Sequence, residues 1–383
     1  MIDIKVYDVV VVGAGPSGST AAYYIDKLNV LIIDKFNFPR FKACGGILSC
    51  GNMPELFGNY AKINKKLKKY TTRSALFYFD THFAFKKTYD FLFHHIERDE
   101  FDNLLLKEAL KKKNVKFRKF NLKEIKKKDN IFVLSDGKNQ IQAKYIIGAD
   151  GWDSVVSSFL GNERRTMEDY GLCLEYDIEC KKKTMDNHVF YFYKEEMGYA
   201  WIFPTHTGYY IGLGDVGKTE KPLKTYLEEF VKYSEHHNLI PKKFKIKKMF
   251  GAPDPINIVD NYSTDKAILC GDALGTVNQT TGEGIFYAMC SGKIAGQIID
   301  ESTNDISKRY KKSIEPVIEE VTFLRKMPSK KTALIIFKYL YKLSVSSLWP
   351  EFVKDKIRDW FIEHTLKRTK LPKFRHHKKI NKF

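Results

Sequence analysis

A glycine-rich stretch near the N-terminus constrains the fold of this chain more than any other feature. The apolar, β-branched run Val9–Val12 precedes the sequence GAGPSG at residues 13–18, and helix-forming residues follow. This order predicts a strand, a tight turn and a helix start. Gly13 permits the turn, Gly15 allows a pyrophosphate to approach the backbone, and Gly18 allows the helix to pack closely on the strand.

A second apolar run, residues 30–33, ends in Asp34. An acid at the end of the second strand is placed to accept a hydrogen bond from a ribose 2′-hydroxyl. A GxGxxG pattern alone is weak evidence, because glycine-rich turns are common, and the alternative is a purely structural turn. Here the strand, the helix and the acid agree. The sequence therefore predicts a dinucleotide-binding domain of the Rossmann-like α/β type.

The size and charge of the chain limit its class. It has 383 residues, of which 43% are hydrophobic, and this suits a globular protein of about two or three domains. A formal net charge of +19 suggests either nucleic acid or an anionic membrane surface as a partner. We expect no nucleic-acid binding, because the lysines are scattered and no recognition motif accompanies them.

The six cysteines give no sign of a metal site. They are Cys44, Cys50, Cys173, Cys180, Cys270 and Cys290. None forms a CxxC pair, and none is spaced with histidines as zinc ligands are. No signal peptide and no run of about 18 apolar residues is visible. We therefore expect a reducing cytoplasmic setting, no metal and no membrane-spanning segment.

Two segments rich in aromatic and β-branched residues interrupt the α/β pattern. They are residues 70–93 and residues 170 to about 250, and both are expected to form antiparallel sheet. Within the second segment, residues 198–204 and 209–214 should pair around the turn at Thr207-Gly208. Such an aromatic sheet suits an apolar ligand.

The remaining elements return to the cofactor domain. We expect a helix from Arg98 to about Lys112 and a hairpin of residues 115–125 and 131–134. A strand should end at Gly148-Ala149-Asp150-Gly151, and a short helix should start at Ser154. A last strand should end at Gly271-Asp272, and a helix should begin at Ile285. The predicted domains are a discontinuous cofactor domain (1–70, 94–165 and 262–300), an antiparallel-sheet substrate domain (71–93 and 166–261) and a basic helical C-terminal region (301–383).

The C-terminal region is apolar in one part and strongly basic in another. Residues 333–341 are apolar but contain Lys338. The tail contains no acid, and its basic residues are Lys367, Arg368, Lys370, Lys373, Arg375, Lys378, Lys379 and Lys382. An amphipathic element on a membrane surface and a helical cap with a solvated tail are both consistent with this pattern.

The order of these motifs resembles that of FAD-dependent oxidoreductases built like p-hydroxybenzoate hydroxylase. The series is GxGxxG, Asp34, Arg98 with Phe101, Asp102 and Leu105, residues 148–151 with Ser154, and Gly271-Asp272 with residues 282–284. Two further stretches, PRFKACGG at 39–46 and YAWIFP at 199–204, resemble the cysteine loop and the YxWxFP motif of the geranylgeranyl reductase family. The resemblance covers roughly residues 1–300. It departs at Gln279, where that family usually has a proline.

The resemblance implies an FAD site. Gly13, Gly15, Gly18 and Asp34 would hold the pyrophosphate and the adenosine ribose. The other implied contacts are Cys44, Gly45 and Gly46 beside the isoalloxazine, Arg98 at the phosphates or ribityl chain, Leu122 at the adenine through its backbone, Asp272 at a ribityl hydroxyl, and Gly284 and Ile285 at the pyrimidine edge. A helix N-terminus at that edge favours the negative charge of the reduced flavin.

The implied activity is saturation of C=C bonds in polyprenyl chains, by hydride from reduced FAD and a proton. Tyr199, Trp201, Phe203 and Pro204 would bind the substrate, and the rings would stabilise a developing cation. These residues also suit an ordinary aromatic core. The catalytic candidates are Tyr199, Trp201 and Cys44, with His206 a weaker one. Arg40 and Lys42 are expected to lower the pKa of the Cys44 thiol.

Several alternatives stay open at this point. Residues 198–204 also resemble the WxWxIP stretch of flavin-dependent halogenases, and a flavoprotein that only passes electrons to a quinone has similar motifs. No second GxGxxG indicates an NAD(P)H site, so the electron donor is either NAD(P)H or a ferredoxin-like protein. The head group of the lipid is undecided between diphosphate, glycerophospholipid and quinone. The basic residues favour an anionic head group and peripheral contact with the inner face of the cell membrane.

Overall fold

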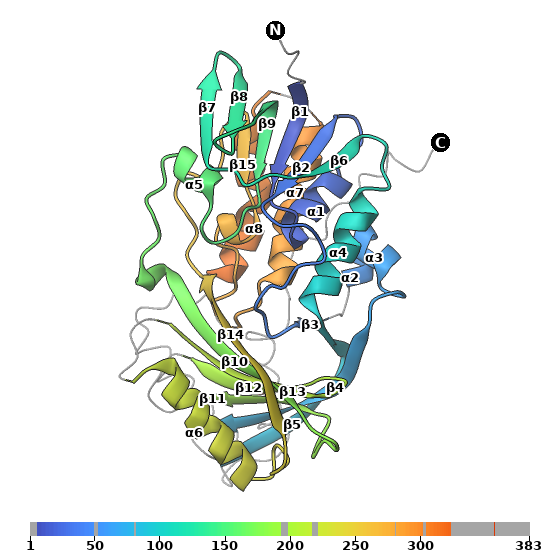
Figure 1. Cartoon of the computed structure of the whole chain (residues 1–383), viewed down its shortest axis with the longest axis vertical. Helices are drawn as coiled ribbons and strands as arrows, with labels where there is room; N and C mark the ends of the chain where they lie inside the picture. The colour runs from blue at the N-terminus through green and yellow to red at the C-terminus, as the bar shows by residue number, and fades with distance from the viewer. Residues whose placement is uncertain are drawn as a thin grey trace.

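Two β-sheets with helices packed on them form the described part of the molecule. The computed structural model describes residues 6–49, 53–79, 82–192, 198–216, 221–279, 281–301, 304–322 and Lys356. The first sheet occupies the upper half of Figure 1 and the second sheet the lower half. Cys50, residues 333–341 and the basic tail from Lys367 lie outside these ranges, so the expectations for them stay predictions.

The first sheet has a parallel centre and an antiparallel edge. Its order is β6-β2-β1-β9-β8-β7, with β15 beside β9. The parallel strands are β1 (Val6–Val12), β2 (Val30–Asp34), β6 (Val115–Lys119), β9 (Gln140–Gly148) and β15 (Ala267–Leu269). The antiparallel strands are β8 (Ile131–Ser135) and β7 (Glu124–Lys128). The predicted hairpin is therefore β7–β8 alone, because β6 joins the parallel edge.

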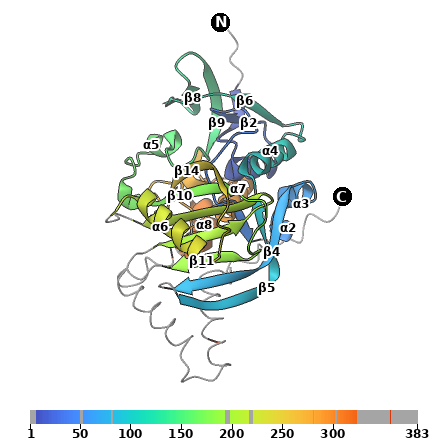
Figure 2. The same cartoon turned by 60° about the horizontal axis from the view of Figure 1, so that its bottom comes forward.

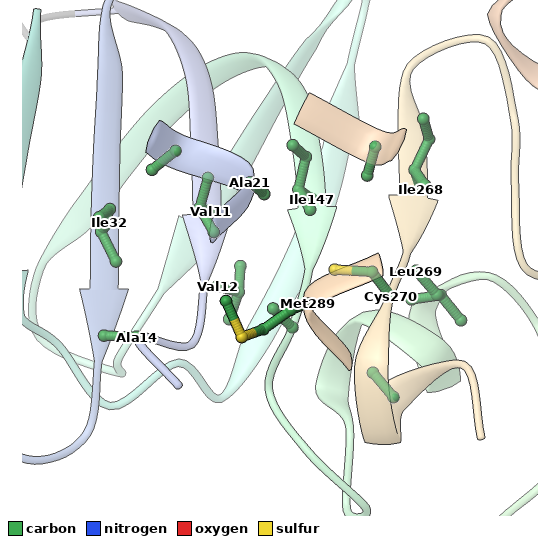
Figure 3. Packing of buried hydrophobic residues seen from close by; sticks show 14 of the residues in the cluster. Val11, Val12, Ala14, Ala21, Ile32, Ile147, Ile268, Leu269, Cys270 and Met289 are labelled. Carbon is green, nitrogen blue, oxygen red and sulfur yellow. The ribbon is translucent and has the colours of Figure 1, made fainter. Parts of the chain in front are cut away.

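Helices bury the centre of this sheet. They are α1 (Pro16–Tyr23), α4 (Arg98–Ala109), α7 (Ile285–Asp300), α8 (Ile306–Val321) and the short α2 (Met53–Leu56), α3 (Gly58–Ile63) and α5 (Val155–Phe159). Figure 3 shows the core that β1, β9, β15 and α7 share. The helices α1 and α7 approach closely, since a Cβ at Gly292 would lie 2.2 Å from the Ser17 carbonyl oxygen. Ser154 caps α5, as predicted.

The second sheet has eight strands in the order β14-β10-β13-β12-β11-β4-β5-β3. They are β14 (Lys245–Pro255), β10 (Tyr170–Glu179), β13 (Gly208–Val216), β12 (Tyr199–Pro204), β11 (His188–Phe192), β4 (Lys69–Phe79), β5 (His82–Ile96) and β3 (Ile47–Ser49). The predicted pairing of β12 with β13 is confirmed. Neighbours are antiparallel except for β11 and β4, which are parallel.

Two features of the second sheet were not expected from the sequence. The helix α6 (Leu223–His236) interrupts the segment expected to be sheet throughout, and it packs on one face (Figure 2). Strand β3 extends the sheet directly from the cysteine loop. The face under α6 mixes aliphatic side chains with tyrosines, whereas the opposite face, called the aromatic face below, is mostly aromatic and also carries Ala43 and Ile47. The cysteine loop therefore meets the aromatic face.

Among the described helices, none combines the length and apolarity that crossing a bilayer requires.

Candidate active site

The glycine turn after β1 is built by close backbone contacts. Gly13 has a φ of +101°, and a Cβ there would lie 2.1 Å from the Ala149 carbonyl oxygen. A Cβ at Gly18 would lie 1.9 Å from the Gly13 carbonyl oxygen. At Gly15 the nearest atom to such a Cβ is Nη2 of Arg40, at 3.6 Å. The turn is therefore closed at two glycines and open at the third.

Asp34 holds the turn from the end of β2. Its Oδ2 accepts a hydrogen bond from the Ala14 N–H at 2.9 Å, and its Oδ1 accepts one from the Phe36 N–H at 2.9 Å. A carboxylate has further lone pairs for a ribose hydroxyl, so the predicted ribose contact stays compatible with these bonds.

Two arginines share one buried carboxylate next to the open glycine. Asp102 is fully buried on α4, and Nε and Nη2 of Arg98 donate to its two oxygens at 3.0 and 2.9 Å. Nη2 of Arg40 lies 3.1 Å from Oδ2 of the same carboxylate. Two guanidinium groups against one carboxylate leave one positive charge in excess. The buried Nη1 of Arg40 has no hydrogen-bond partner among the described residues.

These features fit an FAD pyrophosphate. An anion at Gly15 would meet the excess charge and give the orphaned Arg40 Nη1 an acceptor. The predicted phosphate or ribityl contact of Arg98 stays a prediction, and the structure shows this side chain paired with Asp102. Arg40, which was not predicted as a phosphate ligand, faces Gly15. Leu122 is buried in the connection between β6 and β7, and its adenine contact stays a prediction.

A second group of residues lies where α7 begins. Asp272 follows β15 in a short 3-10 helix, and Nζ of Lys42 lies 2.8 Å from its Oδ2. Burial raises the pKa of Asp272, but Lys42, Arg98 and Arg165 outweigh burial and hold it below its usual value. A Cβ at Gly284 would lie 3.9 Å from Oδ1 of Asp272, and Ile285 is the first residue of α7. The predicted ribityl and pyrimidine ligands are thus neighbours.

The cysteine loop packs against the YxWxFP strand. A Cβ at Gly45 would lie 3.2 Å from Cε2 of Phe203 and 3.6 Å from Nε1 of Trp201. Gly46 has a φ of +69°, and a Cβ there would lie 2.5 Å from the Ile96 carbonyl oxygen. The two motifs are more than 150 residues apart in the sequence. The fold brings them into direct contact.

The Cys44 thiol differs from the expectation. Arg40 and Lys42 were expected to lower its pKa, but they are engaged by Asp102 and Asp272. Burial raises the pKa of Cys44 above its ordinary value, and Arg98 opposes this only in part. Its Sγ accepts a hydrogen bond from the Gly46 N–H at 3.4 Å. Cys44 is therefore a neutral thiol at pH 7 in the FAD-free protein.

The three aromatic residues of β12 share one face of the sheet. The rings of Trp201 and Phe203 are stacked, with centroids 5.8 Å apart and an interplanar angle of 16°. Tyr199 lies on the same face, and its hydroxyl donates to the Thr281 carbonyl oxygen at 2.5 Å. Burial raises the pKa of Tyr199. Tyr199 therefore anchors the loop before α7 rather than offering a proton.

Pro204 was predicted to bind substrate, and this stays a prediction, although the structure places Pro204 on the other face of the sheet from Trp201 and Phe203. Strand residues alternate between faces, and Pro204 is paired with Tyr209, which belongs to the cluster under α6. Pro204 therefore faces away from the aromatic side. His206 is exposed in the turn after β12, where its ring lies 5.5 Å from that of Tyr70.

Sequence reasoning missed a buried acid in this site. Glu175 on β10 is 2% exposed, and Nε1 of Trp201 donates to its Oε2 at 3.3 Å. Burial raises the pKa of Glu175 to about 8, although the bond from Trp201 lowers it. The available signal in the sequence was that Glu175 lies within residues 172–178, a stretch of alternating apolar residues that predicts a strand.

Other titratable groups occupy the same face. Burial lowers the pKa values of His95 and His188 to about 3, and Nε2 of each ring has no hydrogen-bond partner among the described residues. The Cys173 thiol donates to Asp254 Oδ2 at 3.2 Å, and burial raises the pKa of Asp254 to about 6. The face combines aromatic walls with buried acids and neutral imidazoles.

Comparison with known proteins agrees with this site. A family model described as an FAD binding domain matches residues 6–321. Fold and site together define a flavoprotein with the p-hydroxybenzoate hydroxylase architecture, an FAD-dependent oxidoreductase whose cofactor is FAD. A digeranylgeranylglycerophospholipid reductase of Methanococcus vannielii is 30% identical over 334 residues, which cover 79% of each chain. The chain belongs to the geranylgeranyl reductase family.

Further relatives and solved structures extend the comparison. An uncharacterized protein of Methanosarcina barkeri is 32% identical over 330 residues, covering 82% of this chain and 81% of that protein. A geranylgeranyl bacteriochlorophyll reductase-like protein from Thermoplasma acidophilum superposes with a TM-score of 0.68 at 23% identity, over 96% of this chain and 94% of that one. Halogenase PltM, in complex with phloroglucinol and FAD, also gives 0.68, at 17% identity over 94% and 84%. The fold is therefore shared by reductases and halogenases.

Proposed function

We propose that this FAD-dependent oxidoreductase saturates C=C bonds of a polyprenyl chain carried by an archaeal-type membrane lipid. The observation that carries the proposal is the contact of the Cys44–Gly46 loop with Trp201 and Phe203. It brings the two motifs of the reductase family together on one aromatic face. When bound, reduced FAD supplies the hydride for one alkene carbon.

The aromatic face suits the other half of this chemistry. An isolated alkene is a poor hydride acceptor, so protonation toward a tertiary cation must lead or accompany hydride transfer. The ring faces of Trp201, Phe203 and Phe190 are negative, and they stabilise a developing cation where water is excluded. The same rings give an apolar chain a surface to lie against.

The lipid head group and the membrane contact belong to the same proposal. The net charge of +19 favours an anionic head group and peripheral association with an anionic membrane surface. Sedimentation with vesicles that contain or lack anionic lipid checks the second point. We expect binding to anionic vesicles that weakens as salt is raised.

The test of the activity follows lipid mass. The protein is purified, its visible spectrum is recorded, and the flavin is reduced with dithionite without oxygen before geranylgeranyl lipids with different head groups are added. We expect the lipid mass to rise by two hydrogens for each double bond. Unchanged lipid mass together with oxygen consumption would instead identify a monooxygenase or halogenase, and quinone reduction alone would identify an electron carrier.

The Cys44→Ser variant tests the position of the cysteine loop. Flavin content and alkene reduction are measured together. Full activity with full FAD removes the thiol from the mechanism. Loss of activity with full FAD assigns it to the reacting site, and loss of FAD assigns it to cofactor binding. Cys180→Ser is a matched control, because Cys180 packs on the face under α6, opposite the face that the cysteine loop contacts.

A further inference from the structure

The proposed reaction needs a proton donor, and Glu175 is a buried acid of the aromatic face that lies next to the cysteine loop. Glu175 projects from β10 on the same side as Cys173, because strand residues two apart share a face. Its carboxylate oxygen accepts from Trp201 Nε1, and the same nitrogen lies 3.6 Å from the position of a Gly45 Cβ. Glu175 also acts electrostatically on the Cys44 thiol.

The register of the sheet explains why the indole reaches this carboxyl. Gly212 on β13 is paired with Glu175 on one side and Trp201 on the other. A Cβ at Gly212 would lie 2.6 Å from Glu175 Cβ and 2.6 Å from Trp201 Cζ2. The missing side chain lets the indole lie across β13 toward β10. This contact is built by three strands.

The Glu175 carboxyl stays protonated, because the nearby cation Arg98 is paired with another acid. Arg98 is close enough to influence the Cys44 thiol, but its guanidinium is held by both oxygens of Asp102. Burial therefore dominates at Glu175 and raises its pKa to about 8, so that the neutral acid prevails at pH 7. A pKa near the working pH is what a general acid requires.

The neighbouring groups are poorer donors. Tyr199 gives its hydroxyl proton to the Thr281 carbonyl oxygen, and burial raises its pKa. His95 and His188 are neutral at pH 7, because burial lowers their pKa values to about 3. Burial likewise raises the pKa of the Cys44 thiol. Glu175 is the strongest acid among these groups that is still protonated.

We propose that Glu175 is the general acid that protonates the alkene. This inference rests on the proposed reductase function. The carboxyl O–H bond breaks as a C–H bond forms at one alkene carbon, and the hydride of the reduced flavin adds to the other carbon. The alkene is reduced, the flavin is oxidised, and the resulting carboxylate takes a proton from water between turnovers. The Trp201 N–H stabilises that carboxylate.

Two measurements test the assignment. In the FAD-free protein, tryptophan fluorescence is titrated from pH 5 to pH 10. We expect a step near pH 8 that is absent in Glu175→Gln and in Trp201→Phe but present in Glu179→Gln, a control on the same strand with an exposed side chain. A wild-type protein without this step, or a step that survives in Glu175→Gln, would overturn the inference.

The second measurement follows oxidation of the reduced flavin by a prenyl lipid without oxygen. In Glu175→Gln we expect the rate to fall at least 100-fold, while reduction by dithionite and reoxidation by oxygen are unchanged. The wild-type rate should fall above about pH 8, and Glu175→Asp should restore part of it. If the wild type reduces the lipid and Glu175→Gln does so equally, the inference fails alone. If the wild type reduces no lipid, the proposed function fails with it.

Discussion

Two regions of this molecule depend on glycines, the turn after β1 and the aromatic face of the second sheet. The atoms that lie against these glycines differ between the two regions. In the turn, a Cβ at Gly13 or Gly18 would meet backbone carbonyl oxygens. On the aromatic face, a Cβ at Gly212 would meet the side chains of Glu175 and Trp201. Backbone atoms held by a parallel sheet and a helix can move little to accommodate an added methyl group, whereas side chains can change rotamer. The first region is therefore the less tolerant of the two.

Gly18→Ala should have the largest effect. Its Cβ would lie 1.9 Å from the Gly13 carbonyl oxygen, so α1 would have to move away from β1. We expect the free energy of unfolding of the FAD-free protein to fall by about 3 kcal/mol or more. Urea denaturation followed by circular dichroism measures it. An unchanged midpoint would show that the turn adapts as easily as the second sheet.

Gly212→Ala should have a smaller effect on stability and a specific effect on the indole. The added methyl would push Trp201 or Glu175 aside, which should lower the free energy of unfolding by about 1 to 3 kcal/mol. The hydrogen bond between them should break, and the fluorescence of Trp201 should then no longer report on Glu175. A variant as unstable as Gly18→Ala would remove the distinction between the two regions.

The pH dependence of stability separates the aromatic face from the rest of the fold. The folded pKa of Glu175, about 8, lies above its unfolded value of about 4.3, so its contribution is complete below pH 4 and is lost as pH rises to about 8. Between pH 5 and 7.5, the difference in unfolding free energy between wild type and Glu175→Gln should fall by about 1.4 kcal/mol per pH unit.

Measurement of that difference, rather than of the wild type alone, cancels an opposite trend. His95 and His188 have folded pKa values of about 3, below the unfolded value of about 6.5, so their contribution to stability is lost as pH falls from about 6.5 to about 3. The wild type and Glu175→Gln both contain these histidines. A difference that does not change with pH would mean that Glu175 is already ionised in the folded protein.

Gly15→Ala should have the smallest effect on the FAD-free protein and a clear effect on flavin. Its Cβ would meet only Arg40 Nη2 at 3.6 Å, an ordinary contact, so the free energy of unfolding should change by less than about 1 kcal/mol. The methyl would occupy the approach of the pyrophosphate. We expect a lower flavin content after reconstitution with FAD, measured from the visible spectrum. Full flavin content would show that the pyrophosphate does not approach this glycine.

Local patterns explain why the first region was predictable. The strand Val9–Val12, the turn 13–18 and Asp34 lie within 26 consecutive residues, and Asp34 accepts a hydrogen bond from the turn itself. The turn chemistry of glycine and the apolar run are enough to define them. The pairing of β12 with β13 was predictable for the same reason, since a short turn joins them.

The second region depends on contacts that no local pattern contains. Alternation along a strand tells which residues share a face, but which face meets the cofactor domain follows from the docking of α6 and β3. The sequence therefore did not reveal that Pro204 faces away from the aromatic side. Nor did it reveal that Arg40 and Lys42 pair with acids distant in the sequence, so that burial dominates the pKa of the Cys44 thiol.

By itself, the sequence determined that this chain forms an α/β fold with a glycine turn for FAD, and its two spaced motifs identified the reductase family. Only the tertiary structure decided that Glu175 lies beside Trp201 and the cysteine loop. Glu175, Trp201 and Gly212 come from three strands, and their contact exists only when the sheet is in register. Burial then changes the acidity of the carboxyl, and burial is a property of the packed molecule rather than of any short stretch of its sequence.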